Sequence, residues 1–281
     1  MSSIISFFTT LASALYLHLG LAVANLPSYF STTQIIHNVP YGSNPSQTMD
    51  IYVPKYAERR KLDVVVFFYG GRWTFGKKED YRFIGNTFAS ADFITVIFDY
   101  QKYPKVRFPI FIEDAAKALA WVHDNIGKYH GDNTRINIVG HSAGAHIGAL
   151  VTTNPAYLKH EGKTPAQVIH RFAGLAGPYS FTPDEPDLEA IFAPPANYPN
   201  MRASTFVTGK EPPMLLMWGD ADTDVGAFNL EQMDSALRMK RGTVKSIIYP
   251  GLDHIGIIRA LTWMFKDKTS VFLDTINFFR Q

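Results

Sequence analysis

Cysteine is absent from the 281 residues of this chain. Its absence excludes disulfide bonds, thiolate metal sites and a cysteine nucleophile, and it leaves the cellular compartment open. Internal repeats, low-complexity tracts and linkers are missing as well. Apolar residues make up 46% of the chain and charged residues 19%, a composition that supplies a large core and carries too little charge for a disordered protein. The sequence is therefore that of a folded protein without covalent cross-links.

Charge of either sign is missing from the first 49 residues, because Asp50 is the first charged residue of the chain. Residues 4–26 are mostly apolar and end in Ala22-Val23-Ala24, a small-x-small pattern of the kind that signal peptidase cleaves. We therefore favour an export signal or membrane anchor, with possible membrane association through residues 4–26, over a cytoplasmic protein. The alternative is a helix packed on the domain, since no Lys or Arg precedes the run and Thr and Ser dilute it.

The net charge of +2 is close to neutral, and the Lys and Arg residues are scattered along the chain rather than clustered. A nucleic-acid partner is not expected from this distribution, because binding to phosphates needs a basic patch or stripe. The expected partner is a small molecule. The oligomeric state cannot be read from the sequence.

From residue 33 onward, apolar β-rich runs alternate with amphipathic segments, which predicts one α/β domain over residues 33–281. Its sheet should be mostly parallel and eight-stranded, with helices on both faces. The predicted strands are 33–42, 48–54, 63–71, 92–100, 135–140, 168–177, 212–220 and 244–250, and the predicted helices 79–90, 113–126, 143–153, 227–240 and 271–279. Only 179–213 breaks the rhythm. Its seven prolines make regular structure a poor prediction there, and a loop of that length is typical of a lid or cap.

The segment Gly140-His141-Ser142-Ala143-Gly144 has the pattern G-x-S-x-G where a predicted strand ends and a helix begins. In that context the serine lies on a strained bend that exposes its Oγ above the sheet, and glycines flank it because a Cβ there would collide. The backbone N–H of Ala143 should face the same space. The pattern alone is weak evidence, but its place between strand and helix favours Ser142 as a nucleophile.

A serine nucleophile needs a base and a carboxylate that orients the base. If the chain order is Ser, acid, His, only His254 has the required place, a few residues after the last predicted strand. The acid should follow the strand 212–220. Asp220, Asp222 and Asp224 all qualify there; we choose Asp222, with Asp224 second.

A calcium loop is a competing interpretation of the same acidic residues. Asp220, Asp222, Asp224 and Glu231 match positions one, three, five and twelve of an EF-hand loop. However, position six is Val225 instead of the glycine that the sharp turn needs, so we expect no metal site.

Donors for a tetrahedral oxyanion are expected in the turn after the third strand, Gly70-Gly71-Arg72, together with the N–H of Ala143. Glycines there let the backbone approach a substrate oxygen closely. We consider two hypotheses for the side chain of Arg72: it faces the surface, or its planar guanidinium binds a substrate carboxylate.

Taken together, these residues resemble the α/β-hydrolase superfamily. The segments YGGRW, FDYQKYPKVRFP, HGDNTRINIVGHSAGAHIGAL, GLAGPYSF, WGDADTDV and YPGLDHIG are similar to the small carboxylesterase branch that includes isoprenylcysteine methylesterase-like and kynurenine formamidase-like enzymes. The resemblance implies an α/β-hydrolase fold with a small cap, Ser142 as nucleophile, Asp222 as acid, His254 as base, and no cofactor. One departure is Tyr69, which stands where many relatives have the His of His-Gly-Gly.

Aromatic residues near the predicted turn and cap are candidates for a substrate pocket: Trp73, Phe75, Tyr179 and Phe181. His141 and His146 flank the serine, but one base satisfies the mechanism, so we expect them to pack near the bend. The expected function is hydrolysis of esters with small to medium acyl or alcohol groups through an acyl-enzyme. The alternatives are an arylformamidase or amidase with the same three residues, and a non-catalytic binding protein on the same fold.

Overall fold

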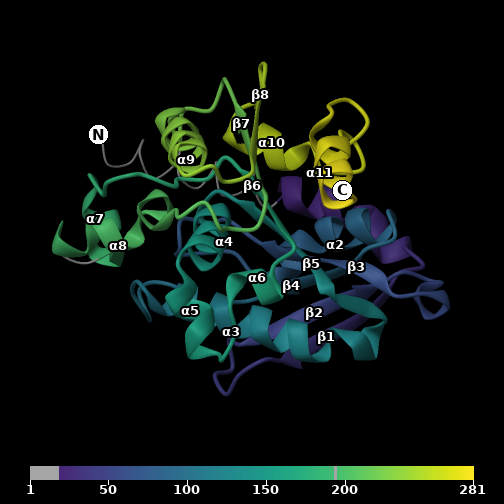
Figure 1. Ribbon diagram of the computed structural model, residues 1–281. Coiled ribbons are helices and arrows are strands. Elements are labelled where there is room, and N and C mark those ends of the chain that lie inside the picture. Colours follow the sequence, from purple (N-terminus) through teal and green to yellow (C-terminus); the bar gives the residue numbers. More distant parts are fainter. Residues whose placement is uncertain (1–18, 193–194) are drawn as a thin grey trace, which may run out of the picture.

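The computed structural model describes residues 19–192 and 195–281, and it contains an eight-stranded sheet (Figure 1). Its strand order is β1-β2-β4-β3-β5-β6-β7-β8. The strands are β1 (Gln34–Pro40), β2 (Thr48–Val53), β3 (Leu62–Phe68), β4 (Ile94–Phe98), β5 (Gly131–His141), β6 (Arg171–Leu175), β7 (Met214–Gly219) and β8 (Val244–Tyr249). The pairings β1–β2 and β2–β4 are antiparallel, and every other pairing is parallel. The predicted mostly parallel sheet of eight strands is confirmed.

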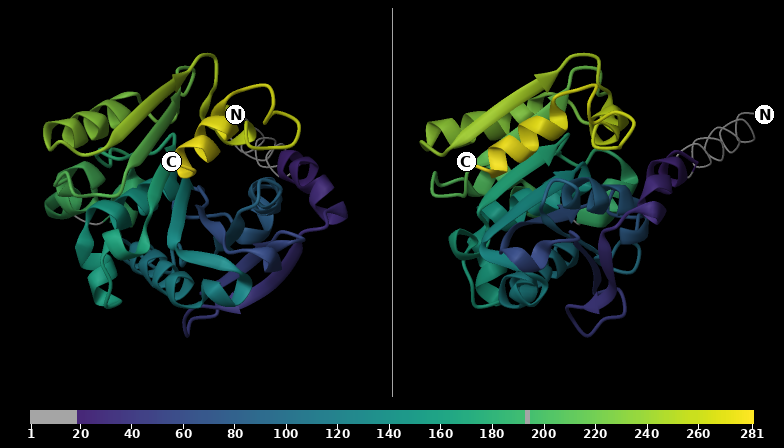
Figure 2. Two further views of the ribbon diagram at one scale, coloured as in Figure 1. Left: turned by 45° about the vertical axis from the view of Figure 1, so that its right-hand side comes forward. Right: turned by 90° about the vertical axis from the view of Figure 1, so that its right-hand side faces the viewer.

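Helices cover both faces of this sheet. Besides a helical stretch at residues 19–25, the described residues form the α-helices α2 (Arg82–Ala89), α3 (Ile110–Asn125), α4 (Ala143–Thr153), α5 (Pro155–His160), α6 (Pro165–Val168), α7 (Pro186–Phe192), α8 (Tyr198–Met201), α9 (Phe228–Met239), α10 (His254–Arg259) and α11 (Val271–Phe279). The helices α3 and α4 contact each other and α4 is linked to α9 through the short helix η6 (Ala203–Phe206), whereas α2 meets α11 through Phe88 and Phe272. Figure 2 shows the sheet between these layers.

The central strands are buried on both faces, as their continuous β-branched and aromatic sequences predict. Val64 to Phe68 of β3 are fully buried. Because β3 and β5 are parallel and pair Phe68 with Gly140, the turns that follow the two strands leave the sheet side by side. The ends of β6, β7 and β8 lie at the same edge, where Leu175 pairs with Met217 and Gly219 with Tyr249. This edge carries the loops that hold the predicted site.

The segment 179–213 differs from the prediction, because much of its described part is helical. It contains α7, η5 (Pro195–Asn197), α8 and η6. Pro186 and Pro195 are the first residues of α7 and η5, and α8 carries a proline in its first turn. A proline there loses no hydrogen bond, because the first N–H groups of a helix have no intrahelical acceptor. The prolines therefore begin short helices here instead of preventing them.

The predicted apolar segment 4–26 lies only partly within the described residues, since 1–18 fall outside them. Residues 19–25 are helical and lead into η1 (Leu26–Phe30), which runs along α2 at the periphery of the molecule (Figure 2). Asn25 is buried; its side chain donates to the carbonyl of Asp80 and accepts from the N–H of Phe83. Within 19–192 and 195–281, no helix has the length and apolar character needed to cross a bilayer. Membrane association stays a prediction.

The turn between β5 and α4 shows why its glycines are required. A Cβ on Gly144 would lie 2.0 Å from the carbonyl oxygen of Phe68, and a Cβ on Gly140 would lie 2.6 Å from the Cα of Ala145. Both neighbours are backbone atoms that have no rotamer to change. Without side chains at these two positions, α4 can pack directly on the ends of β3 and β5.

This contact yields a stability prediction. Gly144→Ala should lower the free energy of unfolding by about 1–3 kcal/mol, because the new methyl group overpacks rigid backbone, even though alanine inside a helix is otherwise favoured by about 1 kcal/mol. The control is Gly127→Ala, where nothing lies within 4 Å of the new Cβ. Urea unfolding of both variants measures the difference, and equal stability of the two would contradict the collision.

Candidate active site

Ser142 occupies the bend between β5 and α4 with a left-handed backbone, φ 54° and ψ −125°. A non-glycine residue in this region is strained by about 1–3 kcal/mol, which the surrounding structure must offset. The N–H of Ser142 donates to the carbonyl of Leu175 at 2.9 Å, which fixes the bend to the neighbouring strand β6. The strain turns Oγ out of the sheet and toward the loop before α10.

His254 begins α10 and lies between Ser142 and Asp222. Its Nε2 is 2.9 Å from Oγ of Ser142, and its Nδ1 is 2.8 Å from Oδ2 of Asp222. A carboxylate only accepts hydrogen bonds, so Nδ1–H donates to Asp222 and Nε2 is left to accept the serine hydroxyl proton. The three side chains, which are far apart in the sequence, form one continuous hydrogen-bonded chain.

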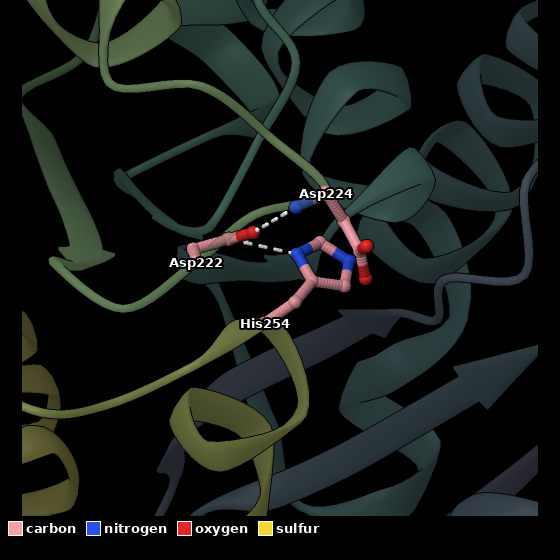
Figure 3. A group of neighbouring side chains, drawn as sticks. All are labelled: Asp222, Asp224 and His254. Carbon is pink, nitrogen blue, oxygen red and sulfur yellow. Dashed lines mark hydrogen bonds and ion pairs between the residues drawn. The ribbon is translucent and has the colours of Figure 1, made fainter.

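Asp222 is held as a carboxylate in a fully buried position. Its Oδ1 accepts the N–H of Asp224 at 2.9 Å (Figure 3) and the N–H of Val225 at 2.9 Å. Burial raises the pKa of this carboxyl, but the hydrogen bonds from His254 and the two backbone N–H groups outweigh it, so the net pKa is lowered. Asp222 is therefore ionised at neutral pH and aligned with the imidazole.

The structure also separates the three candidate aspartates. Asp220 accepts the N–H of Gly251 at 2.6 Å, away from the imidazole. The carboxylate of Asp224 points toward the other side of the His254 ring from Asp222 (Figure 3). One ligand atom each of Asp222, Asp224 and His254 lie within 4.8 Å of one another. A cation bound by all three would need the nitrogen or oxygen that the hydrogen bonds already use, so this arrangement suits a proton better than a metal ion.

The turn after β3 approaches Ser142 closely. A Cβ on Gly70 would lie 3.1 Å from the Cβ of Ser142, and the backbone continues with positive φ at Gly71, Arg72 and Trp73 (123°, 49° and 59°). Within the described residues, no backbone hydrogen bond is donated by the N–H groups of Gly70, Gly71, Arg72 or, at the start of α4, Ala143. These are free donors beside a candidate nucleophile.

Tyr100 supports this turn, and the sequence reasoning missed it. Its buried hydroxyl donates to the carbonyl of Tyr69 at 3.0 Å. Because the C=O and N–H of a trans peptide point in opposite directions, this bond fixes the N–H of Gly70 away from Tyr100. Tyr69 in turn donates to Asp99 and accepts from Lys102, both at 2.8 Å. The Asp-Tyr pair after the fourth strand was the available signal.

His141 and His146 are buried neighbours of the bend. The Nε2 of His141 is 2.9 Å from the carbonyl of His254, and the Nε2 of His146 is 2.7 Å from that of Met201. A carbonyl accepts, so both rings donate from Nε2. Burial lowers the pKa of His141 to about 3 and that of His146 to about 4, so both are neutral near pH 7. Both act as packing and hydrogen-bonding residues, as expected.

A cavity of about 600 Å³ opens beside Ser142 and His254. Three of the four predicted pocket residues line it: Trp73, Phe75 and Phe181. Tyr179 does not, and that prediction was wrong. Its ring is buried against Gly174 and Gly177, which leave room for it: the hydroxyl lies 2.0 Å from where a Cβ of Gly174 would stand. Other apolar residues of the lining include Tyr81, Leu188, Val225, Phe228 and Ile255.

Comparisons with known proteins agree with this architecture. The family model described as the prolyl oligopeptidase family matches residues 112–270, and the model described as BD-FAE matches residues 49–171. The first match covers more than half of the chain. The chain belongs to the prolyl oligopeptidase family of α/β-hydrolases. The α/β-hydrolase resemblance indicated by the sequence motifs is thereby confirmed.

Curated relatives place the sequence in the carboxylesterase branch. It is 27% identical over 254 residues to isoprenylcysteine alpha-carbonyl methylesterase ICME of Arabidopsis thaliana, covering 81% of this chain and 58% of that protein. It is 28% identical over 220 residues to esterase LipQ of Mycobacterium tuberculosis, covering 72% of this chain and 52% of that protein. The chain thus spans just over half the length of either relative.

Solved structures share the fold. Esterase B from Lactobacillus rhamnosis superposes with a TM-score of 0.78 at 17% identity, covering 100% of this chain and 96% of the other. A truncated carbohydrate esterase from gut microbiota gives 0.75 at 21% identity, covering 88% and 95%. At these identities the likeness establishes the fold alone.

The two buried histidines generate a pH prediction. Their pKa is lowered by folding, so the unfolded chain binds more protons below about pH 6.5, and stability is lost as pH falls from there toward about 4. Each histidine contributes at most about 1.4 kcal/mol per pH unit in that window.

The variant His146→Gln keeps a donor for Met201 and removes one titrating group. Urea unfolding at pH 7, 6 and 5 should therefore show a shallower loss of stability in the variant than in the wild type. Identical pH slopes would contradict a buried, neutral His146.

Proposed function

We propose that the protein is a serine hydrolase that cleaves carboxylic esters with small to medium acyl or alcohol groups. The observation that carries the proposal is the chain of hydrogen bonds from Ser142 through His254 to Asp222, beside free backbone donors and an apolar cavity. Each part has a role in acyl transfer. The names of the relatives, a methylesterase and an esterase, support the same reaction class.

In the proposed mechanism, Nε2 of His254 accepts the Oγ proton while Oγ of Ser142 attacks the ester carbonyl. The carbonyl oxygen gains negative charge and takes hydrogen bonds from the N–H groups of the Gly70–Arg72 turn and of Ala143; each such donor is typically worth about 10²–10³ in rate. The tetrahedral intermediate then collapses as His254 protonates the leaving alcohol, which leaves an acyl-enzyme on Ser142.

Water completes the cycle by the same steps. His254 accepts a proton from the attacking water, and the second tetrahedral intermediate releases the carboxylic acid as the imidazolium returns its proton to Oγ. Asp222 keeps the imidazole in the tautomer with the proton on Nδ1 and stabilises its charged form. The cavity would hold the acyl or alcohol group against Trp73, Phe75 and Phe181.

Replacement of the nucleophile tests the proposal. Ser142→Ala should lower kcat by about 10⁶ on a nitrophenyl ester that the wild type hydrolyses, as expected when one member of such a triad is removed. The control is Ser246→Ala, which removes a hydroxyl from β8 that donates to Asp234 and should keep wild-type activity. Equal activity of Ser142→Ala and wild type would show that Ser142 is not the nucleophile.

The substrate class is tested by a panel of nitrophenyl esters from acetate to palmitate, with an arylformamide included. We expect the highest kcat/KM on short and medium esters, because the cavity is of moderate volume. An amide-type substrate uses the same three residues, so faster cleavage of the arylformamide would replace the ester assignment by an arylformamidase. A preference for the palmitate ester would contradict the small to medium substrate.

A further inference from the structure

Arg72 connects the turn after β3 to the cap. Its Nε donates to Oδ2 of Asp187 at 2.8 Å and its Nη2 to Oδ1 at 3.0 Å, which is a bidentate pair, and Nη2 also donates to Glu185 at 2.7 Å. Asp187 lies in the first turn of α7 and Glu185 directly precedes that helix. One guanidinium therefore joins two carboxylates of the cap, and its positive charge is balanced by these two side chains. This geometry favours the cap partners over the substrate carboxylate considered from the sequence.

Trp73, the next residue, makes a second connection of different chemistry. Its ring stacks on Phe181 at 5.5 Å and meets Phe192 edge-on at 4.8 Å between centroids. Phe192 is the last residue of α7, and Phe181 precedes that helix. The left-handed conformations of Arg72 and Trp73 send the two side chains to different parts of the cap, Arg72 to its half-exposed edge and Trp73 into its buried face.

The ion pair also forms part of the cavity wall. Arg72 and Glu185 both line the cavity beside Ser142, as does Leu188 of α7. The Arg72–Glu185 pair thus joins the turn after β3 to the cap at the cavity wall, and the Arg72–Asp187 pair makes the same link just outside the lining. The side chains involved are 39–59% exposed, so an isolated pair would be worth little, but a bidentate contact with a second carboxylate is the geometry in which such pairs contribute.

We propose that Arg72 is the residue that sets the size limit of the substrate: by tying α7 to the oxyanion turn it holds the cap across the cavity and excludes bulky esters. This rests on the proposed ester hydrolysis and deepens it. The side chain of Arg72 acts through the cap, so it is a positioning and specificity-determining residue. Its backbone N–H, the candidate oxyanion donor, is retained in every substituted variant.

The test compares Arg72→Gln, Asp187→Asn and the double variant. Arg72→Gln removes the charge but keeps a long side chain at this left-handed backbone position. Asp187→Asn leaves every residue of the turn after β3 unchanged. The readout is the ratio of kcat/KM on nitrophenyl octanoate to that on nitrophenyl acetate. Each single variant should raise this ratio about 2–10-fold, because a bidentate charged contact that holds the cap is lost. The double variant should gain no more than the larger single one, because both remove the same contact.

Two controls sharpen the comparison. Arg60→Gln breaks an exposed pair with Asp92 at 3.0 Å that does not line the cavity, and it should keep the wild-type ratio. Raising the salt concentration should increase the ratio of the wild type by screening the pair, and should leave that of Arg72→Gln unchanged. Ratios within the error of wild type in both single variants, or additive effects in the double variant, would overturn the proposal.

Hydrogen exchange of the α7 amides gives a readout that needs no turnover. Exchange in 187–192 should be faster in Arg72→Gln and Asp187→Asn than in the wild type and Arg60→Gln, because the cap then opens more often. Unchanged exchange would overturn the role of Arg72 even if the protein is an active esterase. Faster exchange in a protein that hydrolyses no ester would instead leave the ion-pair link intact and reject the proposed function.

Discussion

The site depends on how closely two stretches of backbone approach each other at the carboxyl ends of β3 and β5. Phe68 pairs with Gly140, and the next residues place Gly70 against Ser142 and Gly144 against the carbonyl of Phe68. A Cβ on Gly144 would collide with backbone, and a Cβ on Gly70 would make an unusually tight contact of 3.1 Å with the Cβ of Ser142. This approach holds the serine in its strained conformation and brings free N–H donors within reach of the same space. The imidazole of His254 follows the end of β8, and the carboxylate of Asp222 follows the end of β7.

Much of this arrangement could be predicted from the sequence, because parallel α/β order constrains it strongly. Once apolar runs are recognised as strands, the carboxyl ends of those strands must meet at one edge. Ser142 and His254 follow such ends, so their meeting required no knowledge of side-chain packing. The sequence also indicated the glycines at positions 140 and 144, because a strand that turns directly into a helix leaves no room for a Cβ.

What escaped prediction depended on rotamers and on neighbours distant in the sequence. Asp220, Asp222 and Asp224 are equivalent by position; only the direction of each carboxylate separates them. Tyr179 was assigned to the pocket because aromatic residues near a cap often line one. Its ring packs in the core instead, in the space that the missing Cβ of Gly174 leaves. The partners of Arg72 lie more than 110 residues away in the sequence. They belong to a segment in which the many prolines argued against helices.

Whether Ser142 is an activated nucleophile is tested most directly by treating the protein with a fluorophosphonate and locating the adduct by peptide mass spectrometry. Such reagents react with a serine only when a base removes its proton and donors stabilise the developing charge on the phosphoryl oxygen. We expect a single adduct, on Ser142, that is lost when the protein is unfolded beforehand. No adduct on the folded protein, or an adduct on another serine with Ser142 unmodified, would contradict it.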